Sequence, residues 1–159
     1  MTLAYIGIGS NLDQPRSQVE RAFEELARLP QTRLLARSSL YRSAPLGYGA
    51  QPEFVNAVAA LDTALAASEL LRELQAIESR HARKRSFANA PRTLDLDLLL
   101  FGNASIDEPH LHVPHARMHE RAFVLAPLLE IAPRAVIPGR GSAAERLAAC
   151  AGQKVEKMP

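Results

Sequence analysis

The chain has 159 residues, of which 47% are hydrophobic and 23% are charged, and its formal net charge is +2. This length suits one domain with its own core, and the charge is too small to indicate nucleic acid as a bulk partner. The single cysteine excludes an internal disulfide, and the sequence shows neither a basic, apolar leader nor the roughly 20 apolar residues of a membrane span. We therefore expect a cytoplasmic monomer with one domain over residues 1–159, and no nucleic-acid or membrane partner.

Strand and helix patterns alternate along the first hundred residues. Apolar spacing predicts a first helix before Pro30, which Asp13 can cap, and a second helix over residues 68–80. Strand patterns cover residues 3–9, 32–42, 54–61 and 94–101. The order strand, helix, strand, strand, helix, strand predicts an α+β fold with a ferredoxin-like βαββαβ core. In that fold an antiparallel sheet has helices on one face, which leaves the other face free for ligands.

Two features near the sheet have weak signals by themselves. Gly7 and Gly9 lie at the end of the first predicted strand, but there is no third glycine and no Gly-Lys-Ser/Thr, so neither a dinucleotide loop nor a Walker loop is indicated. Asn56 is the polar residue of an otherwise apolar strand and needs hydrogen-bond partners. Its amide can bond to a neighbouring loop or recognise a planar heterocycle. We favour the second because Phe54 shares its face.

The stretch Leu94-Asp95-Leu96-Asp97-Leu98 has the period of a β-strand, so both carboxylates project from one face and the leucines from the other. The pair is either a solvated face or a site for a hard divalent cation such as Mg²⁺. The flanking residues favour the metal site, because a basic run from Arg80 to Arg92 precedes the strand without one acidic residue. Cations beside a carboxylate pair are typical of phosphoryl transfer.

The rest of the chain is less informative. Gln75 and Glu78 are three residues apart on the second helix and can face the same way, although by themselves they are better explained as a solvated helix face. A loop bounded by Pro109 and Pro114 precedes His115 and a probable helix that ends in AFVLAPLLEIAP. A capping box, Ser142-x-x-Glu145, predicts a short final helix.

Taken together, these stretches resemble the family of 6-hydroxymethyl-7,8-dihydropterin pyrophosphokinases of folate biosynthesis, from end to end. The matching segments are AYIGIGSNL at 4–12, SSLYRSAPLG at 38–47, QPEFVNAVAAL at 51–61, PRTLDLDLLLFGN at 91–103 and VPHARMHERAFVLAPLLEIAP at 113–133. The resemblance implies pyrophosphoryl transfer from ATP to the pterin hydroxymethyl group, with release of AMP. It also implies a ferredoxin-like scaffold with a C-terminal helical extension and two Mg²⁺ ions.

The resemblance also implies a role for individual residues. Asp95 and Asp97 would bind the two Mg²⁺ ions, and Arg83 and Arg92 would stabilise charge on the moving phosphates. The pterin site would be formed by Ser43, Ala44, Leu46, Phe54, Asn56 and Phe123. The ATP site would be lined by Gln75, Glu78, Arg83, Arg92, His115 and Arg121. These residue types suit their roles, because aromatic faces stack on flat rings, amides donate and accept, and arginines pair with phosphate oxygens.

The chain departs from the common pattern of the family at Ala88-Asn89-Ala90, where many members carry Arg-Trp-Gly. The sequence also argues against two other functions. A nucleotidyltransferase would need Gly-Ser close to Asp-x-Asp, whereas Ser10 and Asp95 are far apart in this sequence. An RNA-binding module on the same fold would need the aromatic RNP pattern on its sheet, which is absent from the sequence.

Overall fold

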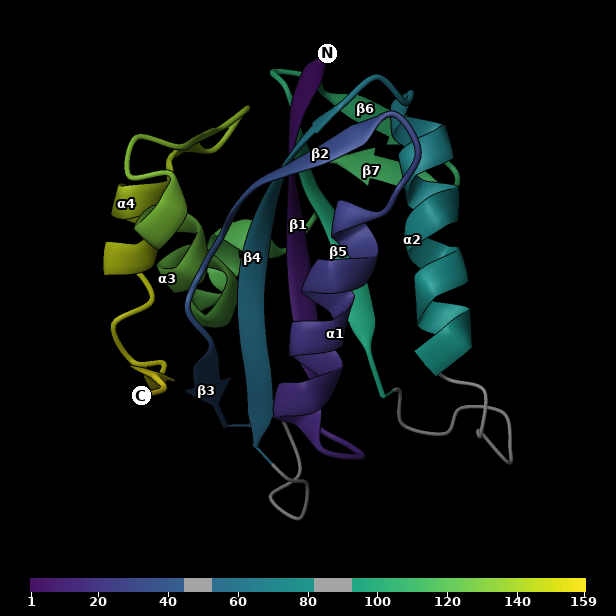
Figure 1. The fold of residues 1–159 in the computed structure, drawn as a ribbon. Coiled ribbons are helices and arrows are strands. Elements are labelled where there is room, and N and C mark those ends of the chain that lie inside the picture. The colour runs from purple at the N-terminus through teal and green to yellow at the C-terminus, as the bar shows by residue number, and fades with distance from the viewer. Residues whose placement is uncertain (45–52, 82–92) are drawn as a thin grey trace.

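The computed structural model describes residues 1–44, 53–81 and 93–159, and its main feature is an antiparallel sheet with helices on both faces (Figure 1). Within these residues the main sheet has six strands. In spatial order they are β10 (Val155–Lys157), β3 (Tyr41–Ser43), β4 (Phe54–Thr63), β1 (Thr2–Ser10) and β5 (Asp95–Phe101), with β2 (Thr32–Arg37) paired to β4 beyond β3.

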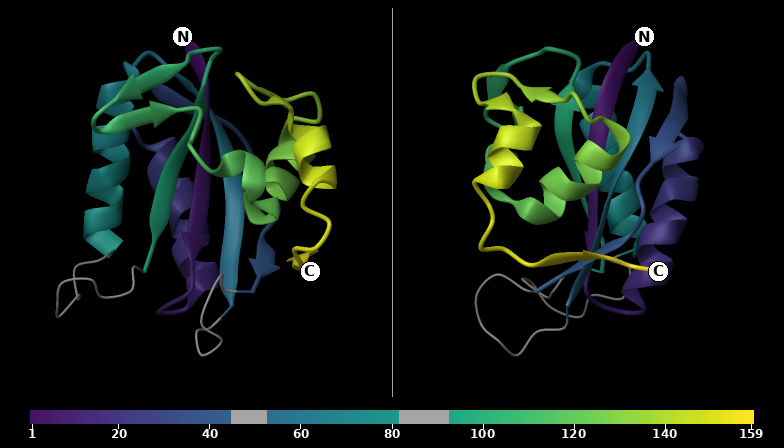
Figure 2. Two further views of the ribbon diagram at one scale, coloured as in Figure 1. Left: turned by 180° about the vertical axis from the view of Figure 1, so that it is seen from behind. Right: turned by 90° about the vertical axis from the view of Figure 1, so that its left-hand side faces the viewer.

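Two helices cover one face of the sheet and the C-terminal helices lie against the other (Figures 1 and 2). Helices α1 (Pro15–Ala27) and α2 (Ala67–His81) form the first layer. Helix α3 (Ala122–Ile131), helix α4 (Ala143–Ala148) and a 3₁₀ turn, η1 (Met118–Glu120), belong to the second layer. The predicted ferredoxin-like core with a C-terminal helical extension is confirmed. The extension covers part of the face that the sequence predicted to be free.

Each layer encloses its own hydrophobic core. On the α1–α2 side, Ile6 and Ile8 of β1 and Leu96 and Leu98 of β5 pack among the helix side chains. On the α3 side, residues such as Leu99, Leu125 and Leu128 form the second core. Because side chains alternate along a strand, burying Leu96 and Leu98 under α1 and α2 turns Asp95 and Asp97 to the opposite face.

The predicted strand over residues 32–42 is two strands, β2 and β3, and the single-strand prediction is wrong. The break lies at Ser38, where the backbone N–H donates to the Val58 carbonyl at 2.9 Å and the Oγ accepts from the Val58 N–H at 2.9 Å. The serine side chain therefore replaces a backbone partner of β4 at this point, as local side-chain bonds can do. The chain then continues as β3 along the other half of β4.

Three smaller differences have local causes. Asp13 does not cap α1, since the N-cap is Gln14 with φ 62° and no side-chain bond. The loop expected between Pro109 and Pro114 contains part of a hairpin, β6 (Ile106–Glu108) with β7 (Leu111–Val113). A second short hairpin joins β8 (Val136–Ile137) to β9 (Gly141–Ser142), after which Ser142 caps α4 as predicted, accepting from the Glu145 N–H at 3.0 Å. No helix in the described ranges has both the length and the apolar character needed to cross a membrane.

Candidate active site

A cavity of about 240 Å³ opens on the α3 side of the sheet and gathers residues from β1, β3, β4, β5 and α3. Its lining residues come from segments far apart in sequence. They are Gly7, Ile8, Gly9, Ser43, Ala44, Phe54, Asn56, Ala57, Asp95, Asp97, Arg121, Phe123 and Val124. Most of the residues predicted for a metal and a flat heterocycle therefore lie in one place.

The floor of the cavity is the backbone of the central strand β1. In the sheet register, Gly9 lies between Asp95 of β5 and Asn56 of β4, and Gly7 lies opposite Asp97. Residues paired across a sheet point to the same face, so Gly9 lies between the Asp95 carboxylate and the Asn56 amide, and Gly7 lies between Asp97 and Val58. A Cβ added at Gly9 would lie 3.3 Å from the Asn56 Oδ1 atom. The absence of two side chains is what makes the cavity.

This role of Gly7 and Gly9 was not predicted from the sequence, where the pair was judged only as a phosphate loop. The signal was available, because glycine inside a strand often marks a place where a ligand or another backbone approaches closely.

Gly9→Val is expected to weaken binding of a ligand in this cavity by about tenfold, since overpacking a tight site costs about 1–3 kcal/mol. The fold should survive, because valine suits a strand. Isothermal titration calorimetry measures the affinity. Gly152→Val is the matched control, since a Cβ at Gly152 meets nothing within 4 Å. Equal affinities in the two variants would contradict the assignment of the cavity floor.

The carboxylate pair lies at the β5 side of the cavity. The Asp97 side chain is 43% exposed, and its Oδ1 is 3.9 Å from the Nε2 of His115. In residues 1–44, 53–81 and 93–159 no group of three or more His, Cys, Asp or Glu residues could hold a metal. Mg²⁺ requires less from a protein, because one or two carboxylates bind it while water and substrate phosphates supply the other ligands. Two partly exposed carboxylates on one face fit that donor set.

His115 has a defined orientation beside Asp97. Its backbone N–H donates to the Leu99 carbonyl of β5 at 2.9 Å, and its Nδ1 accepts from the Arg117 N–H at 3.2 Å. Burial lowers the pKa of His115, Asp97 raises it, and Arg121 and Arg117 lower it, with a net decrease. Because Nδ1 accepts, the neutral ring carries its proton on Nε2, which points toward Asp97 from 3.9 Å, beyond hydrogen-bond distance.

Aromatic and amide groups form the other side of the cavity. Asn56 is 3% exposed, and its Nδ2 donates to the Oγ of Ser43 at 2.7 Å. This bond fixes the amide and leaves its remaining donor and acceptor capacity for a ligand edge. Phe54 and Phe123 also line the cavity, and the Arg121 guanidinium lies 5.5 Å from the centre of the Phe123 ring. This side can hold a flat, polar-edged ring.

Helix α3, which carries Phe123, is tied to the strand side of the cavity by Glu130. The Glu130 carboxylate accepts from the Tyr41 hydroxyl at 2.6 Å and from the Ser39 backbone and hydroxyl at 2.9–3.1 Å. Burial raises the pKa of Glu130, but the hydrogen bonds from Tyr41 and Ser39 and the charge of Lys157 together lower it by more, so the pKa lies below the ordinary value for a glutamate. Tyr41 lies on β3 with Ser43, and Glu130 lies on α3 with Phe123. The cluster therefore holds α3 and β3, which both border the cavity, at a fixed distance.

Tyr41→Phe is expected to lower the free energy of unfolding by about 1.5–3 kcal/mol at neutral pH, as for a lost hydrogen bond to a charged group. A carboxyl with a depressed folded pKa stabilises the protein above its unfolded pKa, and this contribution is lost as the pH falls through the folded value. The difference between wild type and variant should therefore shrink as the pH falls below 4.5. Urea unfolding over this range measures it, and a constant difference would contradict the coupling.

Comparison with known proteins identifies the family. The model of the family 7,8-dihydro-6-hydroxymethylpterin-pyrophosphokinase (HPPK) matches residues 5–133. The chain belongs to this family. It is similar to 2-amino-4-hydroxy-6-hydroxymethyldihydropteridine pyrophosphokinase of Pseudomonas aeruginosa, with 52% identity over 98% of this chain and 96% of the relative. The protein of that name in Haemophilus influenzae is 44% identical, with 99% of both chains covered. The predicted family and enzyme class, an ATP-dependent pyrophosphokinase, are confirmed.

Solved structures support the fold independently of sequence. The chain superposes on a crystal structure described as HPPK-DHPS in complex with substrates, with a TM-score of 0.73 and 11% identity. The match covers 93% of this chain but 43% of the longer one, so this chain spans less than half of that protein. At this identity the comparison shows a shared HPPK fold.

Other predicted residues of the HPPK site lie away from the cavity or outside the described residues. Gln75 is exposed on α2 and does not line the cavity. The Glu78 carboxylate accepts from the Leu96 N–H at 2.8 Å, between the two aspartates. His115 does not line the cavity but lies beside it, with its Nε2 atom 3.9 Å from the Oδ1 of Asp97. Leu46, Arg83 and Arg92 lie outside the described residues, and their roles stay predictions.

Proposed function

We propose that the chain transfers the pyrophosphoryl group of ATP to the hydroxymethyl oxygen of 6-hydroxymethyl-7,8-dihydropterin, giving AMP and the pterin diphosphate in folate biosynthesis. Family membership supports the reaction. The observation that supports the placement of the site is the register Asp95–Gly9–Asn56, which sets a carboxylate and an amide on opposite sides of one glycine floor. Each substrate then has its own side of the cavity.

On the proposed pterin side, the ring stacks against Phe123 and Phe54 while its polar edge meets Asn56. The backbone around Ser43, Ala44 and Leu46 completes the edge contacts. Since Ser43 already holds the Asn56 amide at 2.7 Å, little ordering is needed when the ring binds.

On the proposed ATP side, Asp95 and Asp97 hold two Mg²⁺ ions. When bound, Mg²⁺ neutralises phosphate charge and aligns the attacking and leaving oxygens. Arg121 extends from the start of α3 into the same cavity and supplies a guanidinium for phosphate oxygens. The Nε2–H of His115 donates to a phosphate oxygen that binds beside Asp97. The family resemblance alone supports nucleotide contacts by Gln75 and Glu78, and charge stabilisation on the transferred group by Arg83 and Arg92.

We further propose that residues 1–159 act as one domain and as a monomer in the cytoplasm. The test of the function uses the full chain with ATP, Mg²⁺ and 6-hydroxymethyl-7,8-dihydropterin, and it asks which nucleotide is released. AMP without ADP is expected. ADP would indicate transfer of a single phosphoryl group, and AMP formation that does not depend on the pterin would indicate hydrolysis. Either result would overturn the proposal.

A further inference from the structure

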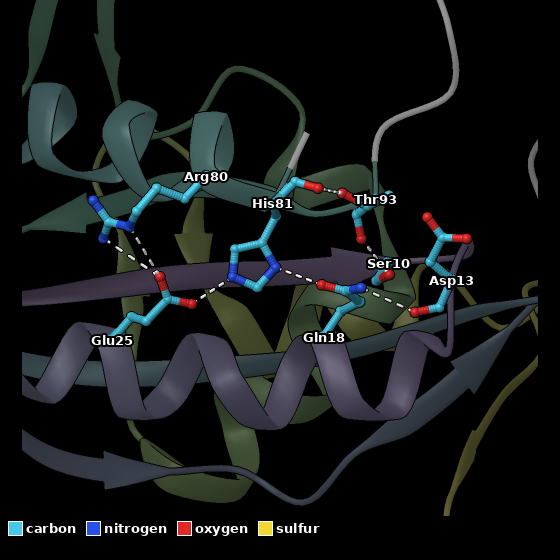
Figure 3. Close-up of polar contacts among 7 residues, drawn as sticks. All are labelled: Ser10, Asp13, Gln18, Glu25, Arg80, His81 and Thr93. Carbon is cyan, nitrogen blue, oxygen red and sulfur yellow. Dashed lines mark hydrogen bonds and ion pairs between the residues drawn. The ribbon is translucent and has the colours of Figure 1, made fainter. Parts of the chain in front are cut away.

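A polar cluster lies on the far side of the sheet from the cavity, where β1 ends, α2 ends and β5 is about to begin (Figure 3). Its central member is His81, the last residue of α2, whose side chain is fully buried. Thr93, two residues before β5, and Ser10, the last residue of β1, are 8% and 1% exposed. None of these three residues belongs to the proposed substrate or metal site.

The His81 ring is held between two acceptors on α1. The Gln18 Nε2 donates to the Asp13 carbonyl at 2.9 Å, so the Gln18 Oε1 faces the Nδ1 of His81 (Figure 3). The Nε2 of His81 faces the Glu25 carboxylate, which also pairs with Arg80 at 3.4 Å. Both ring nitrogens of His81 therefore face side-chain oxygens of α1. The end of α2 is thereby fixed to α1.

Thr93 joins this fixed helix end to the sheet. Its Oγ1 donates to the backbone carbonyl of His81, and its own carbonyl accepts from the Oγ of Ser10 (Figure 3). One residue therefore links α2, β1 and the segment that enters β5. Glu78 adds a second link from α2, at the Leu96 N–H.

These links lie where β5 has the least support from the sheet. β5 is an edge strand that pairs only with β1 among the described strands, and Asp95 opposite Gly9 is the last pair of that ladder. Strand ends open more easily than strand centres, yet a ligand-holding side chain must stay within about 0.5 Å of its working position. The hydrogen bonds of Thr93 to His81 and Ser10 hold the chain just before Asp95, beyond the last pair of the ladder.

We propose that Thr93, with Ser10 and His81 as its partners, is a positioning residue that sets Asp95 and Asp97 for metal binding. This inference rests on the proposed function, because it assigns a purpose to the position of the two carboxylates. The effect travels through the backbone over two residues, so Thr93 needs no contact with either substrate. Misplacing a reacting group by about 1 Å costs about 100-fold in rate, which bounds the expected effect.

The test compares Thr93→Val, which keeps the shape but removes the hydroxyl, with Thr93→Ser, which restores it. Thr63→Val is the matched control, since Thr63 is 0% exposed and its hydroxyl bonds to Thr32 at 2.7 Å and to the Leu65 N–H at 3.1 Å. Thr63 pairs with Thr2, at the opposite end of β1 from the site. Turnover is measured over a range of Mg²⁺ concentrations, and amide hydrogen exchange is measured without ligands.

Thr93→Val is expected to lower kcat about 10- to 100-fold, to raise the Mg²⁺ concentration for half-maximal rate, and to speed exchange at the Leu96 amide. Thr93→Ser should return all three toward wild type, and Thr63→Val should change none of them. Ser10→Ala, which removes the bond to the Thr93 carbonyl and a longer one to the Leu12 carbonyl, should give a smaller change of the same kind and serves if Thr93→Val does not fold. An unchanged Mg²⁺ dependence in Thr93→Val, or equal defects in Thr93→Val and Thr63→Val, would overturn the proposal.

The two proposals can fail separately. If the wild-type chain releases no AMP, the proposed function fails, and the exchange rate at Leu96 still decides whether Thr93 holds the start of β5. If the wild-type chain is active and Thr93→Val behaves like it, only the positioning role fails.

Discussion

Asp95→Ala and Asp97→Ala are each expected to reduce turnover by about 10³-fold or more, because the proposed metal sites supply several kcal/mol of charge stabilisation in the transition state. The fold should be retained, since both side chains are only partly buried and face the cavity. Removing one of two like charges on a strand face also relieves repulsion, so the melting temperature in metal-free buffer should not fall. Steady-state kinetics and thermal unfolding measure the two effects.

Asp107→Ala is the matched control for the carboxylate variants, since the Asp107 side chain is 93% exposed on β6. It should turn over at the wild-type rate. Near-normal rates for both Asp95→Ala and Asp97→Ala at ordinary Mg²⁺ concentrations would rule out the metal role. A loss of activity accompanied by unfolding would place the carboxylates in the structure and not in the chemistry.

Asn56→Ala is expected to weaken pterin binding about 10- to 100-fold while the affinity for ATP stays within twofold. The amide supplies a buried donor and acceptor worth about 1–3 kcal/mol to a ring edge, and its side-chain hydrogen bond goes to Ser43 on the proposed pterin side. Phe123→Ala should act in the same direction by removing a stacking face. Calorimetry with each substrate separately measures both affinities.

The control for the pterin side is Asn103→Ala, at an exposed asparagine outside the cavity. Its affinities for both substrates should equal those of wild type. Asn56→Ala also leaves the Ser43 hydroxyl without its partner, so thermal unfolding of Asn56→Ala separates lost binding from lost stability. Lost ATP binding with unchanged pterin binding would mean that the two sides of the cavity are reversed.

The sequence predicted the position of the two carboxylates, because the pattern there is local. The period of two in Leu94–Leu98 was enough to place Asp95 and Asp97 on one face, because strand geometry leaves no other choice. The break at Ser38 was not predictable in this way, since it depends on a serine meeting Val58 across the sheet. Pairings between segments far apart in sequence carry no periodic signal.

The dependence on pairings between distant segments also explains which residues around the site were not predicted. Gly7 and Gly9 form a cavity floor only because β1 lies between β4 and β5, which depends on the topology of the whole sheet. The links of His81 and Thr93 also join three elements, and each residue alone resembles an ordinary core residue. The sequence therefore predicted the reactive groups and left out the residues that hold them.

In the proposed site, the register across β4, β1 and β5 also sets the length of substrate that fits. Asn56, Gly9 and Asp95 lie side by side on neighbouring strands, so two strand spacings, about 10 Å, separate the backbone that carries the amide from the backbone that carries the carboxylate. A bicyclic ring with one short arm spans this distance. With its far edge on Asn56, a ring with a longer arm would carry its hydroxyl past Asp95, and a ring without the arm would fall short. Substrate length is thus fixed by hydrogen-bonded backbone, which side-chain changes alone cannot stretch.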